Sequence, residues 1–245
     1  MKLLETFISE PRECPYLPTE VSSLEYRIMM EISPEEWETL LSCGWRRFGV
    51  AYFRPRCADC TECVSLRIPV RDFKKSKSQK RVYKKVKKLR LMVGSPRIDA
   101  ERLELYRLWH DLQGNKREWE TNPMTGERYF HEFAFPHECV REFAYYDDEA
   151  ETPRLVAVGI VDETPNALSA VYTYYHPDYA NYSLGTGSIL RQIDVARALN
   201  KEWLYLGYRV LGCQSSIYKQ RFHPHELLQG RPDEASSAEW LPIIQ

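Results

Sequence analysis

A strand, a glycine turn, a helix and a second strand follow one another between Leu168 and Phe222, and this order constrains the fold more than any other stretch. The first segment is β-branched and aromatic, which favours a strand. The helical segment has apolar residues at helical spacing, with Ser188 available as its N-cap. We expect an α+β fold with a mixed sheet flanked by helices. The expected elements are a strand at 168–175, a glycine turn at 183–188, a helix from Ile189, a strand at 203–211 and a short helix at 215–221.

The glycine turn is a candidate anion site, because a helix N-terminus presents free backbone N–H groups. It resembles the acyl-CoA loop of GNAT-type acyltransferases, whose pattern is Gln/Arg-x-x-Gly-x-Gly/Ala. Gly185 and Gly187 fit that pattern, whereas Tyr182 replaces the leading Gln or Arg. The candidate contacts in the turn are Ser183, Leu184, Gly185 and Gly187.

The composition is that of an ordinary globular protein, with 43% hydrophobic and 28% charged residues among 245. No apolar run approaches the roughly 18 residues of a membrane span. The N-terminal segment lacks a signal-peptide core. The odd number of cysteines, seven, argues against a secreted disulfide scaffold. We therefore expect a cytoplasmic protein with no membrane partner.

Three cysteines, Cys57, Cys60 and Cys63, have the Cys-x-x-Cys spacing that lets thiolates reach one metal ion. Cys14 upstream would supply a fourth ligand. Zinc and an iron–sulfur cluster both suit thiolate ligands, and metal-free thiols are the alternative. The remaining cysteines are expected to be buried in the core, and they are Cys43, Cys139 and Cys213.

A basic stretch runs from Arg71 to Arg90, where eleven of twenty residues are Lys or Arg and Asp72 is the only acid. Val82, Val86 and Leu89 lie at helical spacing, so one face of the predicted helix packs while the others project positive charge. A charge this one-sided attracts polyanions, and backbone phosphates are the natural partner. The candidate nucleic-acid contacts are Lys80, Arg81, Lys84 and Lys85.

The stretch Gly94-Ser95-Pro96 marks a predicted boundary between two domains. Residues 1–93 would form an N-terminal domain with the cysteines and the basic helix. Residues 94–245 would form a C-terminal transferase domain.

Several short motifs are spread along almost the whole chain. They are CPYLP at Cys14, GWRR at Gly44, CxxCxxC at Cys57, the basic helix, LSAVYTYYHPDY at Leu168, SLGT at Ser183, YLGY at Tyr205, Tyr218-Lys219 and WLPI at Trp240. In their order and number the chain resembles the aminoacyl-tRNA–protein transferases, above all the bacterial aspartate/glutamate leucyltransferases, which are similar to the eukaryotic arginyltransferases. The resemblance implies a GNAT-like fold and the transfer of an amino acid from aminoacyl-tRNA to proteins that begin with Asp or Glu, which marks them for degradation.

For this reaction we expect aminolysis of an ester with no covalent enzyme intermediate and no required cofactor. A fixed cation would bind the acceptor carboxylate, and backbone N–H groups around Gly185 would stabilise the oxyanion. The predicted catalytic residues are Tyr208, Tyr218, Lys219 and Gly185, and the predicted acceptor contacts are Arg46, Arg47 and Arg221.

The donor amino acid is left open between leucine and arginine. Gly187 and Arg209 depart from the residues usual in the family, and both lie on the unit assigned to the donor. Two other classes are also open: an acyl-CoA-dependent N-acyltransferase, and a metal-dependent RNA-binding module without enzymatic activity.

Overall fold

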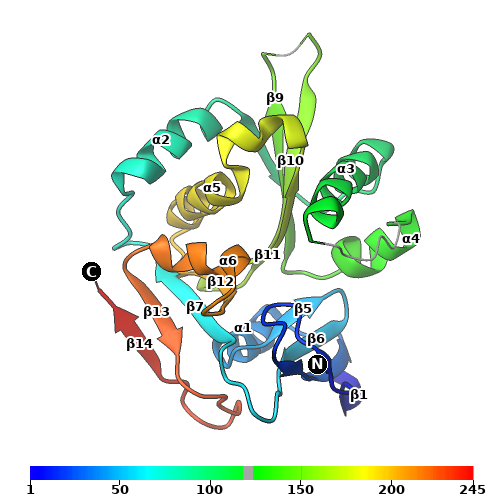
Figure 1. Cartoon of the computed structure of the whole chain (residues 1–245), viewed down its shortest axis with the longest axis vertical. Coiled ribbons are helices and arrows are strands. Elements are labelled where there is room, and N and C mark those ends of the chain that lie inside the picture. The colour runs from blue at the N-terminus through cyan, green and yellow to red at the C-terminus, as the bar shows by residue number, and fades with distance from the viewer. Residues whose placement is uncertain (118–123, 150, 245) are drawn as a thin grey trace. The chain divides into compact units, whose positions relative to one another are not determined.

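The computed structural model describes residues 1–117, 124–149 and 151–244, and its elements are labelled in Figure 1. The chain divides into two compact units. Unit 1 comprises Met1–Lys74, Glu163–Ser169 and Ala196–Gln245, and unit 2 comprises Lys75–Asp162 and Ala170–Val195. Each unit therefore combines segments that are distant in sequence. The predicted division after residue 93 remains a prediction.

Unit 1 contains two larger sheets and a two-stranded one. Strands β1, β4, β6 and β5 pair in that order, and β14, β13, β7, β12 and the start of β11 pair in another sheet. This second sheet is mixed, because β12 is parallel to β11 and antiparallel to β7. The elements are β1 (Lys2–Ile8), β2 (Arg12–Glu13), β3 (Val21–Ser22), β4 (Leu24–Met30), α1 (Pro34–Ser42), β5 (Arg46–Phe48), β6 (Ala51–Pro55), β7 (Val64–Pro69), β12 (Trp203–Arg209), α6 (Gln214–Ile217), the 3-10 helix η3 (Tyr218–Arg221), β13 (His225–Leu228) and β14 (Trp240–Ile243).

Unit 2 is a sheet of β8, β9, β10 and most of β11, with helices on both faces (Figure 1). On one face the Tyr145 hydroxyl donates to Ser188 Oγ of α5 at 3.2 Å. On the other, Arg102 of α3 pairs with Glu142 at 2.6 Å. The predicted α+β class is confirmed. The elements are α2 (Lys77–Val86), β8 (Arg90–Gly94), α3 (Ala100–Arg117), α4 (Gly126–Tyr129), the π-helix η1 (Phe130–Ala134), β9 (Val140–Asp147), β10 (Arg154–Glu163), β11 (Ala167–Tyr175), the 3-10 helix η2 (Pro177–Tyr182) and α5 (Leu184–Ala198).

Helices α1 and α2 begin with the same local signal, a capping box. Ser33 Oγ accepts from the N–H of Glu36 at 3.2 Å, and the Glu36 carboxylate accepts from the N–H of Ser33 at 2.9 Å. Ser76 and Gln79 form the equivalent pair in α2. Each box satisfies two N–H groups that would otherwise lack partners, so each helix begins directly after its capping serine.

Helix α5 corrects the prediction for the glycine turn, because it begins at Leu184 instead of Ile189. Ser188 is not an N-cap: its hydroxyl is buried and accepts from Gln192 Nε2 at 3.0 Å. The glycines therefore lie in the first turn of the helix. At Gly187 a Cβ would collide with Val86 of α2, so the absent side chain is what allows the two helices to pack closely.

Strand β12 is irregular at Gly207, whose φ of 76° is left-handed. The pairing with β7 shifts register between Tyr205 and Tyr208, as expected for a bulge. At the C-terminal end, the WLPI segment forms β14, which pairs antiparallel with β13. No helix within residues 1–117, 124–149 and 151–244 is both long and apolar enough to cross a membrane.

Candidate active site

Lys219 lies at the centre of a cluster of predicted residues in unit 1. Its Nζ donates a hydrogen bond to the carbonyl of Tyr208 at 2.8 Å. Burial, and then the positive charge of Arg46, lower the pKa of Lys219 to about 8. A Cβ built at Gly207 would lie 3.5 Å from Lys219 Nζ and 3.8 Å from Arg46 Nε, so glycine keeps this approach open. An amine with this pKa can exchange a proton near neutral pH.

The two tyrosines predicted to be catalytic, Tyr208 and Tyr218, differ in burial and in hydrogen bonding. Tyr208 is buried, and its hydroxyl donates to the carbonyl of Gly44 at 2.9 Å. Burial raises the pKa of Tyr208 far above the usual range, so this hydroxyl anchors β12 and cannot act as a base at neutral pH. Tyr218 is half-buried next to Lys219. The hydroxyl of Ser216 accepts a hydrogen bond from the backbone N–H of Val210 and donates one to the carbonyl of Val210, both at 3.0 Å. These bonds hold the segment that carries Lys219 against the end of β12.

The three predicted acceptor arginines are not grouped together. Arg46 and Arg47 are neighbours on β5, so their side chains point to opposite faces of the strand. Arg46 lies beside Lys219 and donates to the carbonyl of Trp45 at 2.7 Å, whereas Arg47 donates to the carbonyl of Gly49 at 3.1 Å. Arg221 is exposed at the end of η3. Of the three, Arg46 is the one that the described contacts place near Lys219, because both side chains approach Gly207.

The four predicted cysteine ligands lie in one electrostatic neighbourhood, because Cys57, Cys14 and Cys60 all raise the pKa of Cys63, which burial already raises, to about 12. Arg231 donates hydrogen bonds to the carbonyls of Cys57 and Cys60 at 3.1 and 2.7 Å, and these bonds fix the loop that carries the two cysteines. Within the described ranges, no group of three or more His, Cys, Asp or Glu side chains is placed to hold a metal ion. A metal at these cysteines therefore remains a prediction.

Cys213 is a further thiol in this region, which the sequence spacing did not single out. It is buried, as predicted, but it packs in the same small core as Tyr208, with Cys63 against it. Hydrogen bonds from Ser215 and Ser216 outweigh its burial and lower its pKa. Because Cys213 is remote from the Cys-x-x-Cys motif in sequence, only the tertiary fold could bring them together.

The predicted tRNA-binding residues all belong to unit 2. Lys80, Arg81, Lys84 and Lys85 are exposed on α2, and the buried Val86 confirms the predicted packing face. Lys85 Nζ donates to the carbonyl of Asn181, just before α5, at 2.8 Å.

In the first turn of α5, the side chains have different roles. Ser183 is exposed, and the Leu184 side chain is buried in the core. Gly185 faces open space, with no atom within 4 Å of the position that a Cβ would occupy, so its backbone is open to approach.

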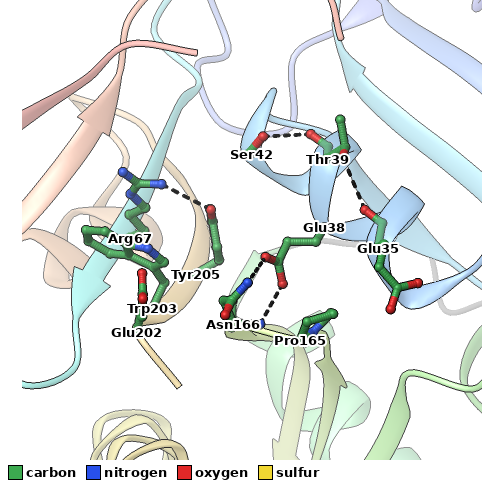
Figure 2. Close-up of a pocket in the computed structure, with 11 residues that line it drawn as sticks. Glu35, Glu38, Thr39, Ser42, Arg67, Pro165, Asn166, Glu202, Trp203 and Tyr205 are labelled. Atoms are coloured by element: carbon green, nitrogen blue, oxygen red, sulfur yellow. Dashed lines mark hydrogen bonds between the residues drawn. The ribbon is translucent and has the colours of Figure 1, made fainter. Parts of the chain in front are cut away.

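A pocket of about 430 Å³ opens near the start of β12 in unit 1, and Figure 2 shows its lining. None of the predicted site residues lines it. Glu38 accepts from the backbone and side chain of Asn166, both at 2.8 Å, and Arg67 is held by Glu226 at 2.7 Å. The lining is acceptor-rich and suits a cation better than a phosphate. Its residues are Glu35, Glu38, Thr39, Ser42, Arg67, Pro165, Asn166, Ala167, Glu202, Trp203 and Tyr205.

Two family models match the chain. The C-terminal model of arginine-tRNA-protein transferase matches residues 101–229, and the N-terminal model matches residues 12–81. An aspartate/glutamate leucyltransferase from Helicobacter hepaticus is 36% identical over 241 residues, which are 98% of each chain. Another from Pseudoalteromonas atlantica is 36% identical over 220 residues, 89% of this chain and 92% of that protein.

Among solved structures, a domain assigned as the C-terminal part of a lysylphosphatidylglycerol synthetase from Agrobacterium fabrum has a TM-score of 0.50 at 14% identity. The match covers 86% of this chain and 64% of that chain. At this level of identity the likeness concerns the fold alone. It supports the predicted architecture, a mixed sheet flanked by helices.

Proposed function

Because this chain belongs to the family of aminoacyl-tRNA–protein transferases, we propose that it transfers leucine from leucyl-tRNA to the N-terminal amine of proteins that begin with Asp or Glu. The observation that carries this proposal is the match along almost the whole chain to relatives named aspartate/glutamate leucyltransferase. The product would carry a new N-terminal leucine for the degradation machinery to recognise. Such substrates imply a cytoplasmic enzyme.

The reaction is the aminolysis of an ester. The acceptor amine forms a bond to the aminoacyl carbonyl carbon, the bond from that carbon to the ribose oxygen breaks, and one proton passes from the amine to the leaving oxygen. The α-ammonium group of a protein has a pKa near ~8, so only modest base assistance is required. Most of the acceleration would come from holding amine and ester together.

We assign the transfer of this proton to Lys219. Its pKa of about 8 matches that of the acceptor amine, so transfer between the two groups is nearly balanced. In its neutral form Lys219 would accept the proton from the attacking amine and return it to the ribose oxygen. The buried hydroxyl of Tyr208 would keep the strand, and with it the carbonyl that binds Lys219, in place. Tyr218 would contact the aminoacyl end.

The donor tRNA would bind along α2 in unit 2. Its exposed cations suit a largely sequence-independent contact with phosphates. The backbone of Ser183, Gly185 and Gly187 at the start of α5 would contact the aminoacyl terminus, and Gly185 is the candidate for the oxyanion. Leu184 would support this turn from the core.

The acceptor carboxylate requires a cation, and Arg46, Arg47 and Arg221 remain our candidates from the sequence. Arg46 is the best placed of the three, because it lies beside Lys219.

The cysteines give a separate proposal, that Cys14, Cys57, Cys60 and Cys63 bind zinc or an iron–sulfur cluster in a structural role. Their neighbouring thiols support it, and the reaction itself needs no metal. Metal analysis of the purified protein and of a Cys60→Ser variant would test the proposal. Absence of both zinc and iron from protein purified without chelator would refute it.

The decisive test uses tRNA charged with radiolabelled leucine or arginine, together with a peptide that begins with Glu and a control peptide that begins with Gln. We expect label to enter the Glu peptide from leucyl-tRNA. Transfer from arginyl-tRNA alone would support the second candidate, an arginyltransferase, which the names of the two family models favour. Transfer from neither would refute the proposed function.

A further inference from the structure

The pocket near the start of β12 has three sides, and all of its lining residues belong to unit 1 (Figure 2). Helix α1 supplies glutamates and hydroxyl groups on one side. Strands β7 and β12 supply Arg67, Trp203 and Tyr205 on the other, and the turn with Pro165 and Asn166 closes the third. Its volume of about 430 Å³ lies in the range of ligand pockets, so it has room for a long side chain.

The charges of this pocket favour a positively charged ligand. Its lining contains three glutamates and one arginine, which are Glu35, Glu38, Glu202 and Arg67. Arg67 is already paired with Glu226 at 2.7 Å. The carboxylate of Glu38 is also used within the protein, because it accepts from two N–H groups of the turn before β11. The carboxylates of Glu35 and Glu202 have no hydrogen bond or ion pair among the described residues, so they are left for a ligand.

Two hydroxyl groups of α1 add further acceptors. Thr39 Oγ1 donates to the carbonyl of Glu35 at 3.1 Å, and Ser42 Oγ donates to the carbonyl of Thr39 at 2.7 Å. Because both hydroxyl protons are used within the helix, the two oxygens are left to accept from a ligand. An ammonium or guanidinium group has donors and no acceptor, so it complements this side. Trp203 and Pro165 supply apolar surface for the methylene stem of such a side chain.

Tyr205 connects this pocket to the cluster around Lys219. Its ring lines the pocket, and the guanidinium of Arg46 lies 5.7 Å from the ring centroid. Burial raises the pKa of Tyr205, the charges of Arg67 and Arg46 lower it, and that of Glu38 raises it, so groups of the pocket and of the cluster both act on this tyrosine. Arg46 in turn lies beside Lys219. The pocket and the proposed catalytic lysine are thus linked through Tyr205 and Arg46.

We propose that this pocket binds a lysine or arginine side chain of the acceptor protein, a few residues after its N-terminal Asp or Glu. The proposal rests on the proposed function, which puts the acceptor amine at Lys219, beside the carbonyl of Tyr208. An extended acceptor that ran along β12 would then pass Tyr205 and Trp203, three and five residues from Tyr208. At ~3.3 Å per residue this is about 10–17 Å, which places the basic side chain at acceptor position four, five or six.

The test uses peptides that begin with Glu and carry a single Lys, Gln or Glu at each position from the second to the ninth. Leucyl transfer at saturating leucyl-tRNA gives the KM of each peptide, and fluorescence anisotropy without tRNA gives its affinity. The variants are Glu35→Gln/Glu202→Gln, which removes the two unpaired carboxylates, and the charge reversal Glu202→Lys. The matched control Glu5→Gln/Glu10→Gln removes two exposed glutamates from another part of unit 1. Circular dichroism checks that each variant is folded.

In wild type we expect Lys at position four, five or six to lower KM about 3- to 10-fold relative to Gln, because contacts with exposed carboxylates are individually modest. In Glu35→Gln/Glu202→Gln this ratio should fall close to one, and the affinities should follow the same pattern. In Glu202→Lys, peptides with Glu at these positions should become preferred over those with Lys. The control should keep the wild-type ratio.

Three results would overturn the proposal. The first is a wild-type KM that does not depend on Lys or Gln at these positions. The second is an equal gain from Lys at every position, because it would come from the overall charge of the protein and not from the pocket. The third is a preference that persists in Glu35→Gln/Glu202→Gln. If wild type transfers neither leucine nor arginine, the proposed function fails, and anisotropy alone decides whether the pocket takes the basic side chain.

Discussion

Two positively charged regions of this protein differ in how they hold their charge. The lysines of α2 in unit 2 are exposed, and Lys85 among them donates to the carbonyl of Asn181. Lys219 in unit 1 is half-buried, donates to a backbone carbonyl and has a pKa lowered to about 8. Exposed charges act at a distance and in numbers, whereas a desolvated lysine exchanges a proton. The comparison teaches that burial decides the properties of a lysine: under the proposed function, the exposed lysines would bind tRNA and the buried one would transfer a proton.

The largest expected effect comes from removing the desolvated amine. Lys219→Met should lower kcat about 10²- to 10⁴-fold, the range that general acid–base groups contribute, while KM for leucyl-tRNA changes little. Lys219→Arg should be similarly impaired, because arginine stays protonated. Single-turnover transfer measures both variants. Full activity in Lys219→Arg would show that only the positive charge matters.

The substitution Lys219→Met should also raise the free energy of unfolding. Burial lowers the pKa of Lys219 from 10.5 in the unfolded chain to about 8, so the unfolded state binds more protons between these values. The contribution of Lys219 to the free energy of unfolding is therefore most favourable above pH 10.5. It becomes steadily less favourable as the pH drops from 10.5 to 8, and it stays constant below pH 8. Urea unfolding of wild type and Lys219→Met should show a stability gap that is larger at pH 8 than at pH 10. An equal difference in stability between wild type and Lys219→Met at pH 8 and pH 10 would contradict the lowered pKa of Lys219.

A smaller effect should follow from reversing exposed charge on α2. The double variant Lys84→Glu/Lys85→Glu should raise KM for leucyl-tRNA about tenfold or more and leave kcat unchanged at saturation. Each lost phosphate contact should lower the slope of log affinity against log salt by about 0.9. Filter binding across a salt series measures that slope, with Lys2→Glu/Arg12→Glu as the matched control in unit 1. Equal slopes in both variants would remove α2 from the tRNA interface.

The smallest effect concerns how α2 is joined to α5. Gly187→Ala should destabilise the protein by about 1–3 kcal/mol, because the new methyl group collides with Val86. Val86→Ala should recover part of that loss in the double variant. Gly185→Ala meets no neighbour and should be neutral or stabilising by up to ~1 kcal/mol, since alanine favours the helix. Additive free energies of unfolding for positions 86 and 187 would argue against the contact.

Much of the fold could be predicted from local signals. The capping boxes at Ser33 and Ser76 fix helix starts through bonds between residues three apart, and the alternating strands required no remote information. The start of α5 was mispredicted, because a Ser followed by apolar residues looks like an N-cap unless its burial under Tyr145 is known.

The candidate site was less predictable. Tyr208 and Lys219 were singled out, but the sequence could not tell that the Tyr208 hydroxyl is occupied by a backbone carbonyl. Likewise, adjacent arginines at 46 and 47 look equivalent in sequence, yet a strand sends them to opposite faces. The pocket beside Tyr205 carried no signal in the sequence, because its glutamates come from α1 and from the residue before β12.

The sequence by itself determined the family, the α+β class and the basic face of α2, because each depends on residue order, periodicity or charge count over short distances. The tertiary structure decided which ionisable groups lose water and which find partners. The lowered pKa of Lys219 and the packing of Cys63 against Cys213 both depend on segments that are remote in sequence. Desolvation and Coulomb interactions depend on distances in space, and only the fold sets those distances.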